Sequence, residues 1–454
     1  MRFYLALFAG KIITLLLRIL GRKGTYLSGK IALKLCPNLI ARIKKPAKVL
    51  AVTGTNGKTT VTNLISDALD ATGCRVLSNR YGSNIAAGVA SALIDGSTLT
   101  GKPKYDAAVL ECDERSARLI FPGLRPDLIL ITNLFRDSMR RNAHPEYIAD
   151  FLASGIPAGT ELLLNADDLI SCRIAPECPR TYFSFDRQDF EREPWDNIVM
   201  DVRLCPECGA PIEWESRRYN HIGRAKCSKC GFTSPQAEVR MISADRGTMR
   251  GVIDFGTETQ EVRLHGNAVY NMYNTLAAAA ALVKLGVAPA DAVKGLNGVD
   301  IVSSRFTEET IGERKLTMIM AKGLNAVACS RSFDYVNAAE GKNTVVLMLD
   351  DVFDEKESSE NIAWLYDADF ELLAGENVVR VVTVGVRRFD SRLRLLLAGV
   401  DDGKIHTAKD LDEACAMVEP GECGRVFLLY ELYREADARR LYSMLADKLR
   451  RAAE

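Results

Sequence analysis

A glycine-rich turn near the start of the chain carries the residues with the clearest chemistry. Between a β-prone run at 48–52 and an amphipathic helical pattern at 61–69, the turn reads Gly54, Thr55, Asn56, Gly57, Lys58, Thr59 and Thr60. Such a turn surrounds a phosphate with backbone N–H groups and a helix N-terminus, while its lysine reaches the terminal phosphates and its hydroxyl holds Mg²⁺. Val52 stands where the general G-x-x-x-x-G-K-[ST] pattern has its first glycine. The string present, Gly-Thr-Asn-Gly-Lys-Thr, is a more specific form of the phosphate-binding turn. We expect this turn to bind ATP, with Lys58 catalytic and Thr59 on magnesium.

Acidic residues follow a second predicted strand, at 107–110. Glu111, Asp113 and Glu114 come directly after it. A carboxylate at the end of a parallel strand beside a phosphate-binding turn can hold Mg²⁺, directly or through water. Glu111 is the best placed of the three, and we expect it to be catalytic and a magnesium ligand. The alternative is that these are solvated loop acids.

Two further polar segments each have a binding and a capping interpretation, and the first should face the same crevice as the phosphate loop. Residues 132–137 end the next predicted strand, where open α/β sheets bind ligands, so the segment serves either substrate binding or capping of the next helix by Asp137. Asn271 and Asn274 open an alanine-rich helix predicted at 271–285. One amide can cap that helix while the other contacts the ATP base, and capping alone is the alternative.

Four cysteines have the spacing of a metal site. Cys205 and Cys208 form one C-x-x-C pair, and Cys227 and Cys230 form another. Two such pairs on tight turns place four thiolates around Zn²⁺, and a closed shell of this kind is structural rather than catalytic. His221 lies between the pairs and is expected to be structural. Basic residues around the pairs also allow nucleic-acid binding, but we expect no nucleic-acid partner.

The remaining cysteines and histidines show no nucleophile setting. Histidine occurs only at 144, 221, 265 and 406, and Cys112, Cys329 and Cys423 have no evident base beside them. These thiols are expected to be reduced core residues in a chain of this size. The sequence therefore predicts no glutaminase activity of its own.

The elements that must position these groups alternate between short apolar runs and helical patterns. This alternation predicts an α/β fold with a parallel sheet wrapped by helices. A stretch rich in Cys, Gly and charge interrupts it at 200–240, and a second α/β series begins near 310. We expect a basic N-terminal helical segment at 1–47, an ATP-binding domain at 48–302 with the zinc ribbon inserted at 200–240, and a smaller α/β domain at 310–454.

The N-terminal segment is basic although the chain of 454 residues has a net charge of zero. Residues 1–48 contain eleven Lys or Arg and no Asp or Glu. The apolar run at 3–20 is interrupted by Lys11 and Arg18, which share a helical face with Thr14, so a membrane span is not expected. The run is either an interfacial helix on a membrane or a helix packed on the domain with its basic face solvated. We expect a cytoplasmic protein, placed at the inner face of the membrane in the first case.

These motifs together resemble the Mur ligase superfamily, and within it the MurT family of amide ligases. The phosphate-binding turn, Asn271 with Asn274, and the inserted four-cysteine ribbon carry the resemblance, supported by the strings at 132–137, 164–168 and 364–371. The resemblance implies ATP-dependent amidation of the D-glutamate α-carboxylate of lipid II through an acyl phosphate, in peptidoglycan synthesis. It also implies ammonia from a glutaminase partner of the GatD type, in a heterodimer at the membrane surface.

The sequence departs from the family before Trp364. The family has an Asp there that completes the partner's Cys–His couple, whereas this chain has Asn361. Asparagine orients an imidazole but offers no charge to the imidazolium, and Glu360 or Asp367 could supply the charge instead. The alternative function is a Mur-type ligase that adds an amino acid or free ammonia to a related precursor without a glutaminase.

Overall fold

The computed structural model describes most of the chain in two compact units. The described residues are 2–21, 25–136, 144–188, 190, 197–266, 268–299, 306–321, 325–350 and 362–453. Unit 1 comprises Met1–Phe135, His144–Trp195 and Asp201–Ile301. Unit 2 comprises Arg136–Ala143, Asp196–Met200 and Val302–Glu454.

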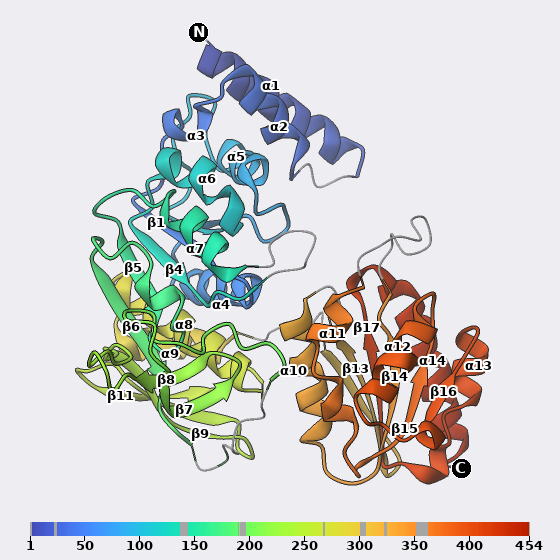
Figure 1. The fold of residues 1–454 in the computed structure, drawn as a ribbon. Coiled ribbons are helices and arrows are strands. Elements are labelled where there is room, and N and C mark those ends of the chain that lie inside the picture. The colour runs from blue at the N-terminus through green and yellow to red at the C-terminus, as the bar shows by residue number, and fades with distance from the viewer. Residues whose placement is uncertain are drawn as a thin grey trace. The chain divides into compact units, whose positions relative to one another are not determined.

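Unit 1 is built on a nine-stranded sheet in the order β11-β10-β9-β6-β5-β4-β1-β3-β2 (Figure 1). From β2 across to β9 neighbouring strands are parallel, whereas β10 and β11 pair antiparallel. The strands are β1 (Lys48–Thr53), β2 (Val76–Ser78), β3 (Ala107–Glu111), β4 (Leu128–Ile131), β5 (Glu161–Asn165), β6 (Arg180–Phe185), β9 (Val239–Asp245), β10 (Arg250–Asp254) and β11 (Thr259–Arg263).

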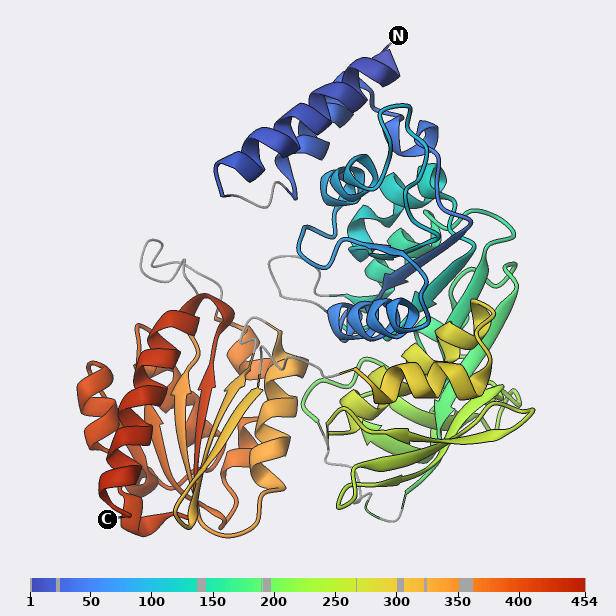
Figure 2. The ribbon, with the colours of Figure 1, turned by 180° about the vertical axis from the view of Figure 1, so that it is seen from behind.

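Helices cover both faces of this sheet, which explains the continuous apolar runs of its central strands. Alternate residues of β1, β3, β4 and β5 share one core cluster with α3, α5, α6 and α7, while α4, α8 and α9 pack together on the opposite face (Figure 2). These helices are α3 (Leu39–Arg42), α4 (Lys58–Ala71), α5 (Ala86–Asp95), α6 (Ala117–Leu124), α7 (Pro145–Ala153), α8 (Val269–Lys284) and α9 (Pro289–Asn297).

The insertion between β6 and β9 contains a two-stranded antiparallel hairpin. Its strands are β7 (Glu213–Tyr219) and β8 (Ile222–Lys226). Asn220 has φ +45° in the turn between them. The hairpin also joins the main domain, because Asp168 after β5 forms an isolated antiparallel bridge with Ile222.

Two N-terminal helices, α1 (Arg2–Ile19) and α2 (Leu27–Leu35), pack on unit 1 beside α5. Lys11 donates to the carbonyls of Ile94 and Ser97, at 2.7 Å each, and Thr14 is buried. The expectation that a packed helix would keep its basic face solvated is therefore wrong for Lys11, because the end of α5 offers carbonyl acceptors to the lysine. Arg18 on the same face remains exposed, in an ion pair with Asp95. Among the described residues, no helix has both the length and the apolar character needed to cross a bilayer.

Unit 2 is a smaller doubly wound domain with a six-stranded sheet in the order β12-β13-β17-β14-β15-β16. Only the β12–β13 pair is antiparallel. The strands are β12 (Phe306–Ile311), β13 (Arg314–Met320), β14 (Asn343–Met348), β15 (Val378–Thr383), β16 (Ile405–Thr407) and β17 (Arg425–Tyr430). One face carries α10 (Ala326–Asn337), α11 (Trp364–Asp367) and α12 (Arg388–Leu397), and the other carries α13 (Leu411–Ala416) and α14 (Glu435–Arg451). The predicted fold class, a parallel α/β sheet with an inserted cysteine-rich module and a second α/β series, is confirmed.

Candidate active site

The phosphate loop, residues 54–60, turns from β1 into α4 on two glycines with positive φ. Gly54 has φ +122°, and Gly57, the N-cap of α4, has φ +86°. A Cβ on Gly54 would lie 2.3 Å from Thr132 Oγ1, and one on Gly57 would lie 2.3 Å from Asn274 Oδ1. Both positions therefore need glycine, for the backbone conformation and for the close approach of a polar side chain.

Lys58 begins α4, and its ammonium lies among carbonyls and carboxylates. Its Nζ is 2.9 Å from Glu114 Oε1 and also donates to the carbonyl of Gly54. Burial on its own would lower the pKa of this ammonium, but the carboxylate of Glu114, helped by Glu111 and Asp113, raises the pKa above its ordinary value. Lys58 is therefore a fixed positive charge at the start of α4. The sequence did not show that Glu114, rather than Glu111, pairs with it.

Glu111 lies where β3 ends, and its carboxylate faces the phosphate loop. Thr59 Oγ1 donates to Glu111 Oε2 at 2.7 Å, and Asn84 Nδ2 donates to Oε1 at 2.9 Å. The side-chain amide of Asn79 accepts from the Glu111 backbone N–H at 2.8 Å and donates to its carbonyl at 2.9 Å. The structure thus brings together the hydroxyl and the carboxylate that the sequence named as magnesium ligands. Oxygen donors of this kind suit a hard cation such as Mg²⁺.

The segment after β4 braces the phosphate loop from the side. Thr132 Oγ1 donates to the carbonyl of Asn56 at 2.7 Å. The side chain of Asn133 makes two bonds to the backbone of Asn56, accepting at 3.0 Å and donating at 3.1 Å. The backbone N–H of Phe135 donates to Thr55 Oγ1 at 2.9 Å. These bonds satisfy the loop backbone and hold its shape.

This bracing role differs from both roles that the sequence suggested for residues 132–137. Thr132 and Asn133 direct their polar atoms at the loop backbone. Asp137, the predicted helix cap, lies outside the described residues. The role was missed because contacts between the loop and the next strand end are not visible as a sequence pattern.

The asparagine pair lies at the start of α8. Asn274 is 7% exposed and contacts Gly57, so it lies directly against the phosphate loop. Asn271 packs against Gly266, where an added Cβ would lie 2.3 Å from Asn271 Nδ2. The predicted helix cap is wrong: α8 begins at Val269, its N-cap is Ala268, and no side chain caps it. Both asparagines are inside the helix, where their amides are available to neighbouring segments.

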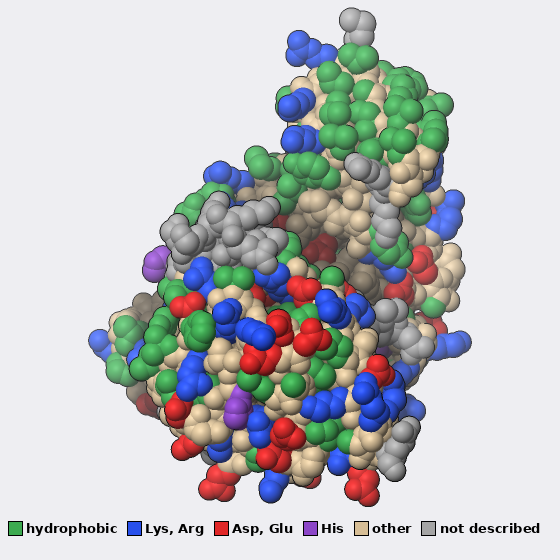
Figure 3. Space-filling model, turned by 90° about the vertical axis from the view of Figure 1, so that its right-hand side faces the viewer, with side chains coloured by type: hydrophobic (Ala, Val, Ile, Leu, Met, Phe, Trp, Pro, Cys, Tyr) green, Lys and Arg blue, Asp and Glu red, His purple; other side chains and the backbone are tan. Residues whose placement is uncertain are grey.

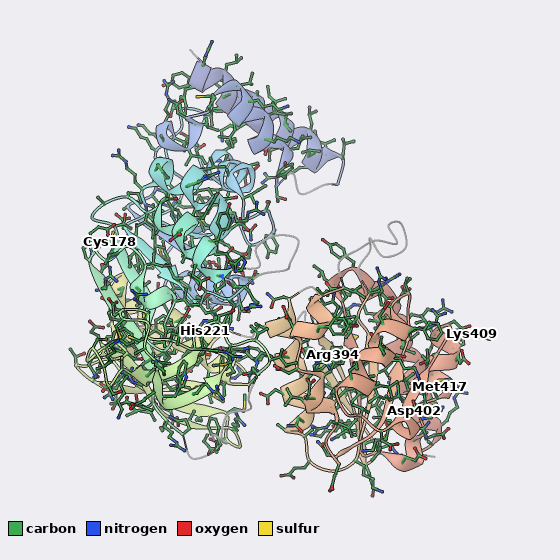
Figure 4. The ribbon with its side chains drawn as sticks, in the orientation of Figure 1. Cys178, His221, Arg394, Asp402, Lys409 and Met417 are labelled. Atoms are coloured by element: carbon green, nitrogen blue, oxygen red, sulfur yellow. The ribbon has the colours of Figure 1, made fainter. Side chains whose placement is uncertain are left out.

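A buried aspartate connects the segment after β4, which braces the phosphate loop, to the zinc-ribbon insertion. Asp168 Oδ2 accepts from the N–H of Leu134 at 2.7 Å. His221, from the hairpin turn, lies 3.2 Å from Asp168 Oδ1 and 2.9 Å from the Leu134 carbonyl, both measured at Nε2. Both partners are acceptors, so Nε2 carries the proton. The His221 ring also packs on Phe135, with 4.5 Å between centroids. The insertion therefore supports the segment that braces the loop. Figure 4 labels His221 among the side chains of unit 1.

The preceding residue, Asp167, anchors the same insertion at a second point. Its Oδ2 accepts from Tyr273 Oη at 2.6 Å and lies 3.4 Å from Arg218 Nη1, with the side chains of the ion pair 0% and 2% exposed. Burial raises the pKa of Tyr273 well above its ordinary value, so this phenol stays a hydrogen-bond donor. Arg224 Nη1 lies 3.6 Å from Asp167 Oδ1. These two arginines thus point into the domain rather than toward an external partner.

The four predicted zinc ligands come together in the insertion. The sulfurs of Cys205, Cys208, Cys227 and Cys230 all lie within 4.8 Å of one another. Two of the Sγ–Sγ distances are 3.5 Å and 3.6 Å, close to the roughly 3.8 Å of a tetrahedral Zn²⁺ thiolate site.

Backbone geometry supports this donor set. Each C-x-x-C pair is followed by a glycine with positive φ: Gly209 at +69° and Gly231 at +78°. Hydrogen bonds from the N–H groups of Cys230 and Lys229 lower the pKa of Cys227 to about 7, whereas burial and the neighbouring sulfurs raise the pKa of Cys230 to about 12. The four thiols thus titrate as one group. The residues therefore fit a closed Zn²⁺ site with no position left for substrate.

In unit 2, the string at 364–371 is held by a buried arginine. Arg394 donates to the carbonyls of Leu365 and Ala368, at 2.9 Å each, and to the carboxylate of Glu371 (Figure 4). Asp367, at the end of α11, lies 3.5 Å from Arg136. The other two predicted partner-assisting residues, Glu360 and Asn361, lie outside the described residues.

Family comparisons agree with this arrangement. Residues 52–196 match the Mur ligase middle domain, and residues 323–431 match the MurT ligase C-terminal family. The lipid II isoglutaminyl synthase (glutamine-hydrolyzing) subunit MurT of Staphylococcus aureus (strain COL) is 31% identical over 405 residues, 88% of this chain and 89% of that protein. The subunit of the same name from Streptococcus pneumoniae is 29% identical over 434 residues, 94% of this chain and 93% of that protein.

Solved structures share the fold. A pseudomurein peptide ligase type C from Methanothermus fervidus has a TM-score of 0.67 at 18% identity, covering 90% of this chain and 79% of that one. MurF from Acinetobacter baumannii has a TM-score of 0.64 at 16% identity, covering 92% and 80%. The middle-domain match and the curated relatives show that the chain is a Mur ligase, and the fold agrees. More narrowly, the length and level of identity to the curated relatives show that the chain belongs to the MurT family.

The contacts of His221 predict that the insertion controls nucleotide affinity. We expect His221→Ala to raise the Kd for a non-hydrolysable ATP analogue by about fivefold to thirtyfold. Without His221 the segment that braces the phosphate loop is less well fixed, and nucleotide binding must then offset about 1–2 kcal/mol of lost contacts. Titration calorimetry measures the change. Arg173→Ala, which removes only an exposed ion pair between the domain and the insertion, is the control. Equal affinities for His221→Ala and the wild type would contradict the coupling.

The cysteine cluster predicts that metal and folding of the insertion are lost together. We expect Cys227→Ser to lower bound zinc and the melting temperature, because metal binding is coupled to folding in such modules. Elemental analysis and thermal melts check this, with Cys74→Ser, outside the cluster, as the control. A Cys227→Ser protein with full zinc and an unchanged melt would show that the cluster does not hold the metal.

Proposed function

We propose that this chain is the ATP-dependent amide ligase subunit of a lipid II isoglutaminyl synthase, acting in peptidoglycan and cell-wall synthesis. The observation that carries the proposal is the braced phosphate loop, with Lys58, Thr59 and Glu111 grouped at its end, in a chain of the MurT family. The product is D-isoglutamine, formed at the α-carboxylate of the D-glutamate in the lipid II stem peptide.

The reaction needs two steps because a carboxylate is a poor electrophile. The carboxylate oxygen first attacks the γ-phosphorus of ATP, giving an acyl phosphate and ADP. Ammonia then attacks the acyl carbon, phosphate leaves with the C–O bond electrons, and the nitrogen loses a proton. The phosphoryl group thus serves as the leaving group.

The residues of the site suit the first of these steps. Lys58 and the backbone N–H groups of the phosphate loop would bind the phosphates and stabilise charge on the transferring group. Thr59 and Glu111 would hold Mg²⁺, which neutralises phosphate charge. Asn274 keeps the loop in shape, and Asn271 is the candidate for contact with the adenine base.

Ammonia is proposed to come from a GatD-like glutaminase in a heterodimer. The curated relatives are named as subunits of a glutamine-hydrolysing enzyme, which supports a partner for this chain. Glu360 or Asp367 would supply the negative charge to the partner's imidazolium that Asn361 cannot. Because lipid II is a lipid-linked substrate, we place the enzyme in the cytoplasm at the inner face of the membrane.

Asn361 also favours a second candidate function, a Mur-type ligase that uses an amino acid or free ammonia without a glutaminase. The two are separated by incubating the chain with ATP, Mg²⁺ and lipid II, with either ammonium or glutamine plus a GatD-like partner. Mass spectrometry reports the replacement of a hydroxyl by an amine. Product with ammonium but never with glutamine and partner would remove the glutaminase from the proposal. No amidated product under either condition would overturn the amidation itself.

The same assay tests the role of the phosphate loop. We expect Lys58→Gln to lower the rate on the order of 100-fold or more, because the charge that stabilises phosphoryl transfer is lost. The amide of the substituted glutamine can still donate a hydrogen bond to Glu114. Circular dichroism checks that the variant is folded. Lys102→Ala, at an exposed site, is the control. Wild-type turnover by Lys58→Gln would exclude this site as the place of reaction.

The partner-assisting residue is tested by the ratio of two rates. We expect either Asp367→Asn or Glu360→Gln to lower glutamine-driven amidation at least about tenfold while ammonium-driven amidation is unchanged, because only glutamine hydrolysis uses the imidazolium. The variant that changes the ratio identifies the residue. An unchanged ratio in both variants would mean that the charge comes from elsewhere.

A further inference from the structure

Helix α1 presents an apolar face to solvent along its whole length. The face is formed by side chains that are between 43% and 72% exposed: Tyr4, Leu5, Phe8, Ile12, Leu15, Leu16, Ile19 and, just after the helix, Leu20. Their spacing of three and four residues puts them on one side of the helix. Scattered exposed apolar residues are normal on a protein surface, but a contiguous stripe of this kind marks an interaction site.

The opposite side of α1 is the one packed on unit 1. It buries Phe3, Ala6 and Leu7, and it also contains Lys11 and Thr14. Lys11 is bonded to carbonyls at the end of α5, and Arg18 forms an ion pair with Asp95 at 2.8 Å. The helix is therefore apolar on both sides, whereas an ordinary surface helix buries one apolar stripe and exposes a polar face. The burial of Phe3 and Leu7 and the hydrogen bonds of Lys11 hold this side of the helix on unit 1, so the other apolar side faces outward.

The surface continues onto the next helix. Tyr26, Leu27 and Leu35 of the α2 region are also exposed, at 37% to 43%. Figure 3 shows hydrophobic side chains gathered over this part of the molecule, with Lys and Arg side chains at the edges. At about 1.5 Å per residue, α1 is roughly 27 Å long.

Charge identifies the occupant of this surface. Residues 1–48 contain eleven Lys or Arg and no acidic residue. Exposed basic residues of the two helices include Arg2, Lys30 and Lys34. A second copy of the chain would bring the same positive charge to the interface and repel it. A bilayer with anionic headgroups offers both an apolar layer and negative charge.

We propose that the outward face of α1 docks unit 1 on an anionic phospholipid bilayer, with the helix lying parallel to the surface and its apolar side chains at the boundary of headgroups and acyl chains. The buried contacts of Phe3 and Leu7 and the hydrogen bonds of Lys11 keep the helix on the protein, so it would lie on the membrane without crossing it. The proposal deepens the proposed function, since a lipid-linked substrate is held in such a bilayer. Only the biological purpose of the docking rests on the proposed function; the binding to lipid does not.

The test is co-sedimentation of the full chain with vesicles that contain no substrate. We expect binding to vesicles of phosphatidylcholine with phosphatidylglycerol, at least about tenfold weaker binding to phosphatidylcholine alone, and weakening by salt. The double variant Ile12→Asn with Leu16→Asn should lower the vesicle affinity at least about tenfold. Both sites are exposed, and thermal melts and ATP-analogue binding confirm that the variant is folded. Leu397→Asn, at an exposed leucine of α12, is the matched control.

Each contrary result overturns the proposal. Equal vesicle binding by the double variant and the wild type would mean that the chain binds lipid elsewhere. A wild type that ignores vesicles but forms a dimer in sedimentation velocity, lost in the double variant, would make the face a contact between copies. A monomer that ignores vesicles would leave the face without a lipid role. Amidation of a water-soluble substrate analogue is assayed separately, so the docking and the proposed function can fail independently.

Discussion

The phosphate loop keeps its shape because polar side chains from distant segments lie directly against two of its glycines. Thr132 approaches Gly54 from the end of β4, and Asn274 approaches Gly57 from α8. A loop of this kind has little internal structure, so its N–H groups can point at a phosphate only if other segments fix the backbone. The position of Lys58 at the start of α4, and of Thr59 beside Glu111, depends on this enclosure.

The zinc-ribbon insertion takes part in the same enclosure. A two-stranded hairpin is marginally stable alone, and four thiolates on one metal would supply the missing folding energy. The folded hairpin places His221 beside Asp168 and Arg218 beside Asp167, and both aspartates are fully buried. Buried carboxylates are costly when their partners are removed. The cysteine cluster thus lies far along the sequence from the phosphate loop, but its hairpin contacts the segment that braces this loop, through His221 and Asp168.

Patterns that depend on local spacing were read correctly from the sequence, whereas contacts between segments were not. The parallel α/β class followed from alternating apolar runs, and the four cysteines were identified as one group by their spacing. The bracing by Thr132 and Asn133 and the anchoring by Asp167 and Asp168 were missed, because they depend on which strand ends are neighbours in the sheet. Helical periodicity showed that α1 has two faces. It could not show which face is packed, because that depends on the carbonyls at the end of α5.

The central claim is that ATP activates a carboxylate by forming an acyl phosphate. The most direct measurement uses lipid II in which the α-carboxylate of D-glutamate carries a heavy-oxygen label, incubated with the chain, ATP, Mg²⁺ and ammonium. Mass spectrometry of the released phosphate then reports the origin of its oxygens. The account predicts that labelled oxygen passes from the carboxylate to inorganic phosphate in step with amide formation. Amide formation with release of phosphate that carries no label would contradict the acyl-phosphate mechanism.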